Sequence, residues 1–165
     1  IINQEEPFTA SLERRLKAAS DCAKYGYKVA FHFDPLIWVE DFENLYGELI
    51  NQLTSTIDEN LVEFISVSTF RCPNDLLDNI RKRKKPSILL KGDYIRGLDG
   101  KVRYYKALRS KMLKFTVSNI RKNWTKPFIY FCMEHDSLWK NILGYDPLAR
   151  EEFEKLFPHY NCQSS

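Results

Sequence analysis

The sequence predicts an α/β fold, in which helices alternate with the strands of a parallel sheet. Three apolar, β-prone runs supply the strands, at residues 27–33, 62–70 and 127–133. Between them lie segments whose apolar residues recur at the spacing of an amphipathic helix. Parallel neighbours need a long crossover connection, usually a helix, so this alternation indicates an open parallel sheet with helices packed on it.

The first part of the chain is predicted to be a loop followed by a helix. Residues 1–8 read as a strand end and a loop, closed by Pro7. Ser11 can cap the helix that follows, and Gly26 can end it, because glycine is the usual residue just after a helix. The apolar residues of this helix recur at helical spacing, at Leu12, Leu16 and Ala19.

A second helix is predicted between the first two strands. The strand at 27–33 ends at Asp34-Pro35, and the strand at 62–70 ends at Thr69-Phe70-Arg71. The helix between them covers residues 40–56. Its inner stripe is expected to consist of Phe42, Leu45, Leu49, Ile50 and Leu53.

The middle of the chain is short of apolar residues and rich in cations. Pro73 opens a short helix that runs to about Ile80, and residues 87–90 are expected to form a short strand. Between these two elements lies a run of cations, which consists of Arg81, Lys82, Arg83, Lys84 and Lys85.

The strongest local pattern is a β-hairpin with arms at residues 93–98 and 101–106 and with Asp99-Gly100 at its tip. A two-residue type I′ turn needs positive φ at both central positions, which Asp and Gly tolerate best. Alternation along the second arm places Arg103 and Tyr104 on opposite faces. The hairpin is either a solvated surface feature or a recognition element, whose guanidinium groups pair with phosphate and whose rings stack on bases.

A long basic helix at residues 107–123 leads from the hairpin to the third strand. Short helices are predicted at 136–143 and 147–157, and the tail from Asn161 to Ser165 is expected to be loose. With 165 residues, of which 44% are hydrophobic, residues 1–165 are expected to form a single domain with a substantial core. The chain begins with Ile1 instead of Met, so a fragment of a longer protein is expected.

Composition argues against several classes of protein. No apolar run approaches the roughly 18 residues that a membrane span needs, and no signal peptide is visible, so a cytoplasmic protein without a membrane partner is expected. The four cysteines lie far apart, without the close pairs that ligate metals, and are expected to be reduced thiols. No P-loop, dinucleotide-binding loop, nucleophile elbow or zinc motif is present to specify an enzyme.

Positive charge is concentrated in one segment. Residues 79–126 hold 16 Lys or Arg and two Asp or Glu, a net charge of +14, whereas residues 1–78 carry −8 and residues 127–165 carry −3. One-sided positive fields attract polyanions. The segment is therefore either a nucleic-acid-binding surface or a solubilising face without a partner.

Polar side chains follow two of the predicted strands. His32 and Asp34 lie at the end of the first strand, and Ser68, Thr69 and Arg71 lie at the end of the second. In parallel α/β folds, binding and catalysis gather at the carboxyl ends of strands. Structural alternatives remain open, since His32 can be a satisfied core histidine, Asp34 a turn former and Arg71 half of a lone ion pair.

Four stretches together resemble the spore photoproduct lyase family of radical S-adenosylmethionine enzymes. They are Gly26–Pro35, Ser68–Arg71, the Asp-Gly-Lys-X-Arg-Tyr element at 99–104, and Tyr130–Glu134 with Trp139 beyond. The resemblance covers roughly residues 5–145 and departs from the family pattern at Ser68 and Val102, where Gly and Met are usual, and at Asp34, where the founding enzyme has a small residue.

The resemblance implies the C-terminal part of a partial (β/α)6 radical-SAM-type barrel with a protruding β-hairpin. In that family an N-terminal half binds a [4Fe-4S] cluster through a Cys-x3-Cys-x2-Cys loop. The cluster cleaves S-adenosylmethionine to a radical that reverses a thymine-dimer-type lesion in DNA. This chain lacks the cluster motif and supplies no metal ligands, so it is expected to need the missing N-terminal half and to be inactive alone.

The resemblance also implies site residues. Phe33, Asp34 and Pro35 would pass near the adenine of S-adenosylmethionine. The hairpin at 93–106, through Lys101, Arg103 and Tyr104, would contact damaged duplex DNA, with Tyr104 stacking on an exposed base. From its charge, and not from the resemblance, the segment is expected to attract phosphate through Arg81, Lys82, Arg83, Lys84 and Lys85 and through the helix that bears Arg109, Lys111 and Lys114. The alternatives are a nucleic-acid-binding module without chemistry and a radical enzyme with a substrate other than DNA.

Overall fold

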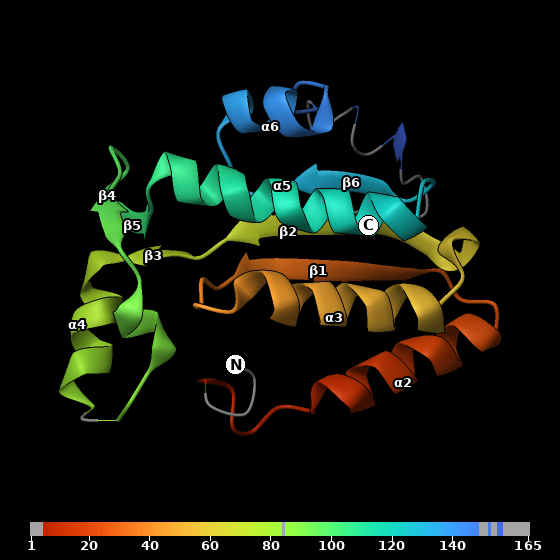
Figure 1. Ribbon diagram of the computed structural model, residues 1–165, viewed down its shortest axis with the longest axis horizontal. Helices are drawn as coiled ribbons and strands as arrows, with labels where there is room; N and C mark the ends of the chain where they lie inside the picture. Colours follow the sequence, from red (N-terminus) through yellow and green to blue (C-terminus); the bar gives the residue numbers. More distant parts are fainter. Residues whose placement is uncertain (1–4, 84, 149–151, 153–154, 157–165) are drawn as a thin grey trace, which may run out of the picture.

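The computed structural model describes residues 5–83, 85–148, 152, 155 and 156. It contains a parallel sheet and an antiparallel sheet, each of three strands. Figure 1 shows the helices α3 and α5 in front of the parallel sheet and the antiparallel sheet at one end of the molecule, beside α4. Within the described residues, no helix has the length and apolar character to span a bilayer.

The parallel sheet consists of β1 (Val29–Leu36), β2 (Val62–Thr69) and β6 (Phe128–Phe131), in the order β1-β2-β6. All three predicted strands are therefore confirmed as parallel neighbours. Phe33 of β1 pairs with Val67 of β2, which in turn pairs with Phe131 of β6. The predicted end of the first strand is wrong, because β1 continues through Asp34 and Pro35 to Leu36, which pairs with Thr69. Proline is tolerated in an edge strand, because a residue whose nitrogen faces outward there has no neighbouring strand to donate a hydrogen bond to.

Four helices pack around this sheet: α2 (Leu12–Lys24), α3 (Phe42–Thr56), α5 (Lys106–Asn123) and α6 (Asp136–Leu143). The predicted caps of α2 are confirmed, since the Ser11 side chain accepts a hydrogen bond from the Arg14 N–H and Gly26 has a φ of +84°. The core between helices and sheet is apolar, and its most enclosed members include Phe42, Ile50, Ile65, Leu113, Ile120 and Ile129. The buried face of α3 differs from the prediction at Leu45, which is 46% exposed, and at Tyr46, which is buried.

The antiparallel sheet consists of β3 (Arg71–Pro73), β5 (Lys101–Tyr104) and β4 (Tyr94–Arg96), in the order β3-β5-β4. β3 follows β2 after a single residue, so the chain runs from one sheet directly into the other. Between β3 and β4 lie α4 (Asn74–Lys82) and a 3₁₀ turn, η2 (Ile88–Lys91); a second 3₁₀ turn, η1 (Glu59–Leu61), precedes β2. The predicted strand at 87–90 is wrong, because the Ser87 side chain accepts from the Leu89 N–H and caps this turn.

The hairpin loop is one residue longer than the predicted two-residue turn. The Gly97 N–H donates to the Lys101 carbonyl at 2.8 Å, and the Gly100 N–H donates to the Gly97 carbonyl at 3.0 Å. Gly100 has a φ of +74°, whereas Asp99 is not among the described residues with positive φ. A type I turn followed by a left-handed glycine is the usual three-residue hairpin loop, so the type I′ prediction is wrong.

Three predictions fall wholly or partly outside the described residues. They concern the first four residues of the segment 1–8, most of the helix at 147–157, and the tail from Asn161 to Ser165. Lys84 of the cation run also lies outside them.

Candidate functional site

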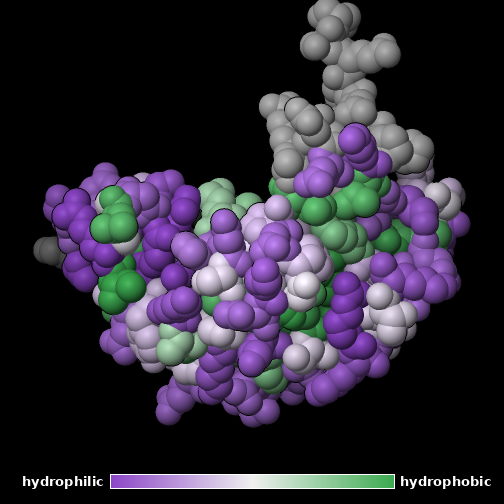
Figure 2. Space-filling view, turned by 90° about the horizontal axis from the view of Figure 1, so that it is seen from above, coloured by the Kyte–Doolittle hydropathy of each residue, from purple (hydrophilic) through white to green (hydrophobic). Residues whose placement is uncertain are grey.

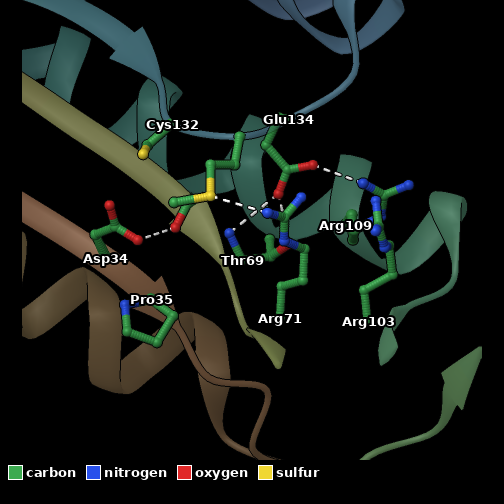
Figure 3. Close-up of a pocket in the computed structure, with 10 residues that line it drawn as sticks. Asp34, Pro35, Thr69, Arg71, Arg103, Arg109, Cys132 and Glu134 are labelled. Carbon is green, nitrogen blue, oxygen red and sulfur yellow. Dashed lines mark hydrogen bonds and ion pairs between the residues drawn. The ribbon is translucent and has the colours of Figure 1, made fainter. Parts of the chain in front are cut away.

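The carboxyl ends of the three parallel strands meet the antiparallel sheet at a small polar pocket of about 130 Å³. Figure 3 shows Asp34 and Cys132 on one side of this pocket and three arginines on the other. The pocket brings together residues from β1, β2, β3, β5, α5 and the segment after β6: Asp34, Pro35, Ser68, Thr69, Arg71, Arg103, Arg109, Cys132, Met133 and Glu134. The expectation that polar residues gather at the strand ends is therefore met.

A carboxylate and a thiol lie together on one side of the pocket. The Ser68 hydroxyl donates a short hydrogen bond to the Asp34 carboxylate. Burial raises the pKa of the Cys132 thiol, and the charge of Asp34 and a hydrogen bond to it raise that pKa further. The thiol is thus less acidic than an ordinary cysteine, which disfavours the reactive thiolate form.

A buried ion pair closes the bottom of the pocket. Arg109 Nη1 lies 2.6 Å from Glu134 Oε2, and the two side chains are only 10% and 3% exposed. The other carboxylate oxygen of Glu134 accepts from the Thr69 N–H at 3.1 Å and from the Thr69 hydroxyl at 2.6 Å. Glu134 therefore joins the segment after β6 to the end of β2 and to α5, which fixes the pocket floor.

Two arginines line the rim on the hairpin side. Arg71 Nη1 lies 3.4 Å from Asp99 Oδ2, and Arg103 donates a short hydrogen bond to Asp99 Oδ1. Arg71 Nη2 also contacts the Met133 sulfur at 3.0 Å. Met133 has a φ of +56°, a left-handed conformation that costs a residue with a side chain roughly 1–2 kcal/mol. Strained backbone at a polar pocket is a frequent mark of a functional site.

A second and larger hollow, of about 660 Å³, runs along the outer edge of β1 between α2 and α3. Its walls are largely apolar and include Leu12, Leu16, Phe31, Leu45 and Leu49. Asp34 and Pro35 line both hollows, so the end of β1 separates the groove from the polar pocket.

Of the residues assigned to the cofactor, two are accessible and one is not. Asp34 and Pro35 are exposed, whereas Phe33 is only 8% exposed and belongs to the core. Any contact that Phe33 makes with a ligand would therefore involve only the small part of its ring that reaches the groove.

The prediction that Tyr104 stacks on a base is wrong, because Tyr104 is buried. Tyr104 has no exposed surface, its ring stacks on Tyr94 with centroids 5.0 Å apart, and its hydroxyl accepts a hydrogen bond from the Trp38 N–H at 2.9 Å. The preceding backbone N–H, that of Ile37, is bound in the same way by Tyr46 at 2.9 Å. Tyr104 thus anchors the hairpin to the loop after β1, and Leu98 is the fully exposed apolar residue at the hairpin tip.

The cation run lies at the end of α4 and faces solvent. Arg81, Lys82, Arg83 and Lys85 are exposed, and Lys101 on the hairpin is half-buried. Figure 2 shows the end of the molecule that carries α4, β4 and β5 as mostly hydrophilic surface with a small hydrophobic patch. Arg81 pairs with Asp78 at 2.7 Å, an exposed contact that leaves the cation accessible.

The three cations predicted on the long helix have different environments. Arg109 is buried in the pocket floor, so its prediction as a surface phosphate contact is wrong. Lys111 pairs with Glu43 at 3.0 Å and lies 5.4 Å from the centre of the Trp38 ring, and Lys114 is exposed. A sequence signal for Arg109 existed, because it shares helical spacing with the buried residues Met112, Leu113, Thr116 and Ile120.

His32, which the sequence left open, is exposed and lies on the opposite face of β1 from Phe31 and Phe33. Its Nδ1 is 2.6 Å from the Ser66 hydroxyl, and its ring meets the edge of Phe64 at 5.8 Å. The histidine is therefore a hydrogen-bonded member of the sheet face and not a core residue.

The described residues do not fit an iron–sulfur cluster. They contain no group of three or more His, Cys, Asp or Glu side chains that could hold a metal ion. Their cysteines lie apart: Cys22 is exposed, Cys72 buried and Cys132 partly buried. Asp34 and Pro35, the exposed residues assigned to the cofactor, both line the polar pocket, where the carboxylate is an accessible hydrogen-bond acceptor.

Comparisons with known proteins all point to one family. A family model described as spore photoproduct lyase matches residues 1–83. Solved structures of a spore photoproduct lyase mutant with bound AdoMet and dinucleoside spore photoproduct, and of another mutant, are 26% identical to the chain, with TM-scores of 0.68. Each match covers 79% of this chain but 41% of the solved one, so the chain spans about two-fifths of the length of these relatives. No curated protein matches the sequence.

Proposed function

Because the chain belongs to the spore photoproduct lyase family, we propose that it is the carboxyl-terminal part of a radical S-adenosylmethionine enzyme that repairs DNA. The observation that carries the proposal is the polar pocket where β1, β2 and β6 end. A solved relative binds both AdoMet and dinucleoside spore photoproduct, so both kinds of ligand are candidates for this chain.

The proposed architecture is part of an incomplete (β/α)6 barrel, completed by an N-terminal half. Support comes from the sheet itself, in which β1 and β6 are edge strands within the described residues. The apolar groove along the outer edge of β1 is suited to a further strand, because it offers both unpaired backbone groups and a hydrophobic wall. Cluster ligands would come from that other half, since the described residues offer none.

Asp34 and Pro35 are proposed to face S-adenosylmethionine, with Phe33 behind them. When bound, this cofactor would supply the radical chemistry of the reaction. The Asp34 carboxylate accepts a hydrogen bond from Ser68, which orients it toward the pocket, where it can accept another from an amino group. Partial burial of Cys132 and the nearby Asp34 raise the pKa of its thiol at the same pocket.

The hairpin and the exposed cations are proposed to bind damaged duplex DNA. Arg81, Lys82, Arg83 and Lys85 supply sequence-independent attraction to phosphate, as the +14 segment predicts. Leu98, fully exposed at the hairpin tip, is the proposed base contact in place of the buried Tyr104. Apolar wedges such as leucine can enter a base step and partly unstack it.

Activity of the protein expressed from its complete gene tests this proposal. Purified without oxygen, it is expected to cleave S-adenosylmethionine and to restore thymines in an oligonucleotide that carries spore photoproduct. Asp34→Ala should weaken cofactor binding roughly tenfold and leave cluster assembly intact, whereas Asp21→Ala, a matched surface change, should have no effect. A cluster-loaded protein that cleaves cofactor but leaves the lesion unchanged would point to a substrate other than this DNA lesion.

A nucleic-acid-binding module without chemistry is the second candidate, and the concentration of cations in residues 79–126 favours it. One measurement distinguishes the two functions. A module would bind duplex DNA without cleaving S-adenosylmethionine under any reducing condition.

A further inference from the structure

We propose that Arg71 and Arg103 form a binding subsite for a phosphodiester group of nucleic acid, and that Asp99 occupies this subsite as a displaceable stand-in. The inference rests on the proposed DNA-facing role of the hairpin and adds to it a named phosphate site. It also gives the hairpin tip a second task, since Asp99 must leave the arginines when a phosphate binds.

The two arginines are neighbours because of strand register. Arg71 on β3 and Arg103 on β5 are direct partners in the antiparallel ladder, so their side chains leave the same face. Like charges in directly opposed positions destabilise a sheet. These side chains are also withdrawn from water, being 23% and 17% exposed, which increases their repulsion. The pair therefore needs an anion between its members.

Asp99 is that anion in the structure. One of its carboxylate oxygens faces Arg71 and the other accepts from Arg103, so the two oxygens bridge the two guanidinium groups. The two free oxygens of a phosphodiester can make the same bridge, and guanidinium groups pair with phosphate and carboxylate through the same fork of donors.

The arginines nevertheless retain unused hydrogen-bonding capacity. The distance of 3.4 Å from Arg71 Nη1 to Asp99 is longer than a good hydrogen bond. Arg71 Nη2 contacts the sulfur of Met133, which is a weak acceptor. Within the described residues, the buried Nε of Arg103 has no hydrogen-bond partner. A phosphodiester in place of Asp99 could engage the Arg71 donors more closely than Asp99 and the Met133 sulfur do.

Asp99 is free to leave. Its side chain is 41% exposed, and it lies in the three-residue loop at the tip of the hairpin. Desolvation raises the pKa of Asp99, but hydrogen bonds from Arg103 and the Lys101 N–H, with the charge of Arg71, outweigh it and leave the pKa below its usual value. The stand-in is therefore charged at neutral pH and competes with other anions.

Gly97 permits this contact and provides a way to disturb it. A Cβ atom at Gly97 would lie 2.7 Å from Asp99 Oδ1 and 2.9 Å from Arg103 Nη2. Gly97 is not among the glycines with positive φ, so alanine can adopt its backbone conformation. Gly97→Ala would therefore disturb the side chains of both Asp99 and Arg103 while every charge is kept.

The test measures binding of thymidylyl-thymidine, which has one phosphodiester, and of thymidine, which has none, to the full chain by calorimetry. Asp99→Asn is expected to bind thymidylyl-thymidine about tenfold more tightly than the wild type. Arg71→Gln and Arg103→Gln should each weaken binding about tenfold or more. Thymidine binding should not change in any variant.

Two matched controls separate the subsite from general electrostatics. Asp21→Asn and Lys140→Gln change the net charge by the same amount as Asp99→Asn and Arg71→Gln, but at exposed positions away from the pocket. The proposal is overturned if Asp99→Asn binds no better than Asp21→Asn, or if Arg71→Gln binds as well as Lys140→Gln. It is also overturned if S-adenosylmethionine competes for the pair, since the anion would then be the carboxylate of the cofactor.

Failure of this proposal is distinguishable from failure of the proposed function. The binding test needs neither a cluster nor catalysis, whereas the proposed function is judged by cofactor cleavage and lesion reversal. A chain that passes one test and fails the other shows which statement was wrong.

Discussion

The ion pair between Glu134 and Arg109 lies almost completely out of water, which makes it sensitive to the loss of either charge. The carboxylate also satisfies two donors of Thr69, so its position is fixed on both sides. A buried ion pair contributes little net stability, because the cost of removing both charges from water offsets their attraction. Replacing one partner by a neutral residue is costly, because the other charge is then left buried and unpaired.

Glu134→Gln is therefore expected to lower the free energy of unfolding by about 3–5 kcal/mol, since Arg109 would face an amide in place of a carboxylate. Urea unfolding of the variant and the wild type measures this difference. The double variant Glu134→Gln with Arg109→Met removes both charges and keeps an acceptor for Thr69, so it should recover much of the stability. A single variant within about 0.5 kcal/mol of the wild type would contradict this account.

Two buried tyrosines show how a residue that looks like a ligand contact can be a structural tie. Tyr104 and Tyr46 accept hydrogen bonds from consecutive backbone N–H groups, those of Trp38 and Ile37, just after β1. Their hydroxyls thus satisfy backbone donors that would be costly to bury unpaired. The hairpin is in this way attached to the loop that follows Asp34 and Pro35.

The hairpin and the end of α4 are separate elements that should contribute to DNA binding in different ways. Leu98 is proposed to act by contact with bases, which is insensitive to salt, whereas the cations of residues 81–85 are proposed to act by releasing counterions from phosphate. The two contributions can therefore be measured separately.

Leu98→Ser should reduce the preference for distorted over intact duplex and leave the salt dependence of binding unchanged. Replacement of Arg81, Lys82 and Arg83 by glutamine should instead flatten the salt dependence by about 0.9 log units for each phosphate that is no longer neutralised, with an unchanged preference. Binding isotherms on both duplexes at several salt concentrations measure both quantities. If Leu98→Ser keeps the wild-type preference, the hairpin tip does not act as a wedge.

In the molecule as a whole, the outer edge of β1 is the feature that most needs a partner. Within the described residues, β1 pairs with β2 on one side only, and the groove on its other side is apolar. Exposed strand edges with hydrophobic surroundings invite another strand. In the proposed larger barrel, a strand of the N-terminal half would pair with this edge of β1.

Hydrogen exchange tests this placement. In the chain alone, the amides of residues 29–36 that point away from β2 should exchange quickly, and in the protein expressed from its complete gene they should be protected. The amides of β2, which has a neighbour on each side, should exchange slowly in both. Equal exchange of the β1 amides in the two proteins would place the additional strand elsewhere.

Features that depend on short stretches of chain could be predicted from the sequence. Helical periodicity, the cap at Ser11, the stop at Gly26 and the three apolar strands were all predictable, because each depends on residues within a few positions of one another. The cation-rich segment and the family resemblance also follow from the linear sequence. The hairpin was predictable as a hairpin, but its loop type depended on the register of β4 with β5.

Which side chains of a short helix or strand are buried, by contrast, depends on tertiary packing. Tyr104 and Arg109 look like surface contacts in the sequence and are enclosed in the structure, since the loop after β1 and the segment after β6 pack where local patterns predict solvent. The opposition of Arg71 and Arg103 likewise depends on the pairing of strands that are about thirty residues apart in the chain. Local patterns cannot specify such contacts, because they depend on which distant segment supplies the neighbouring surface.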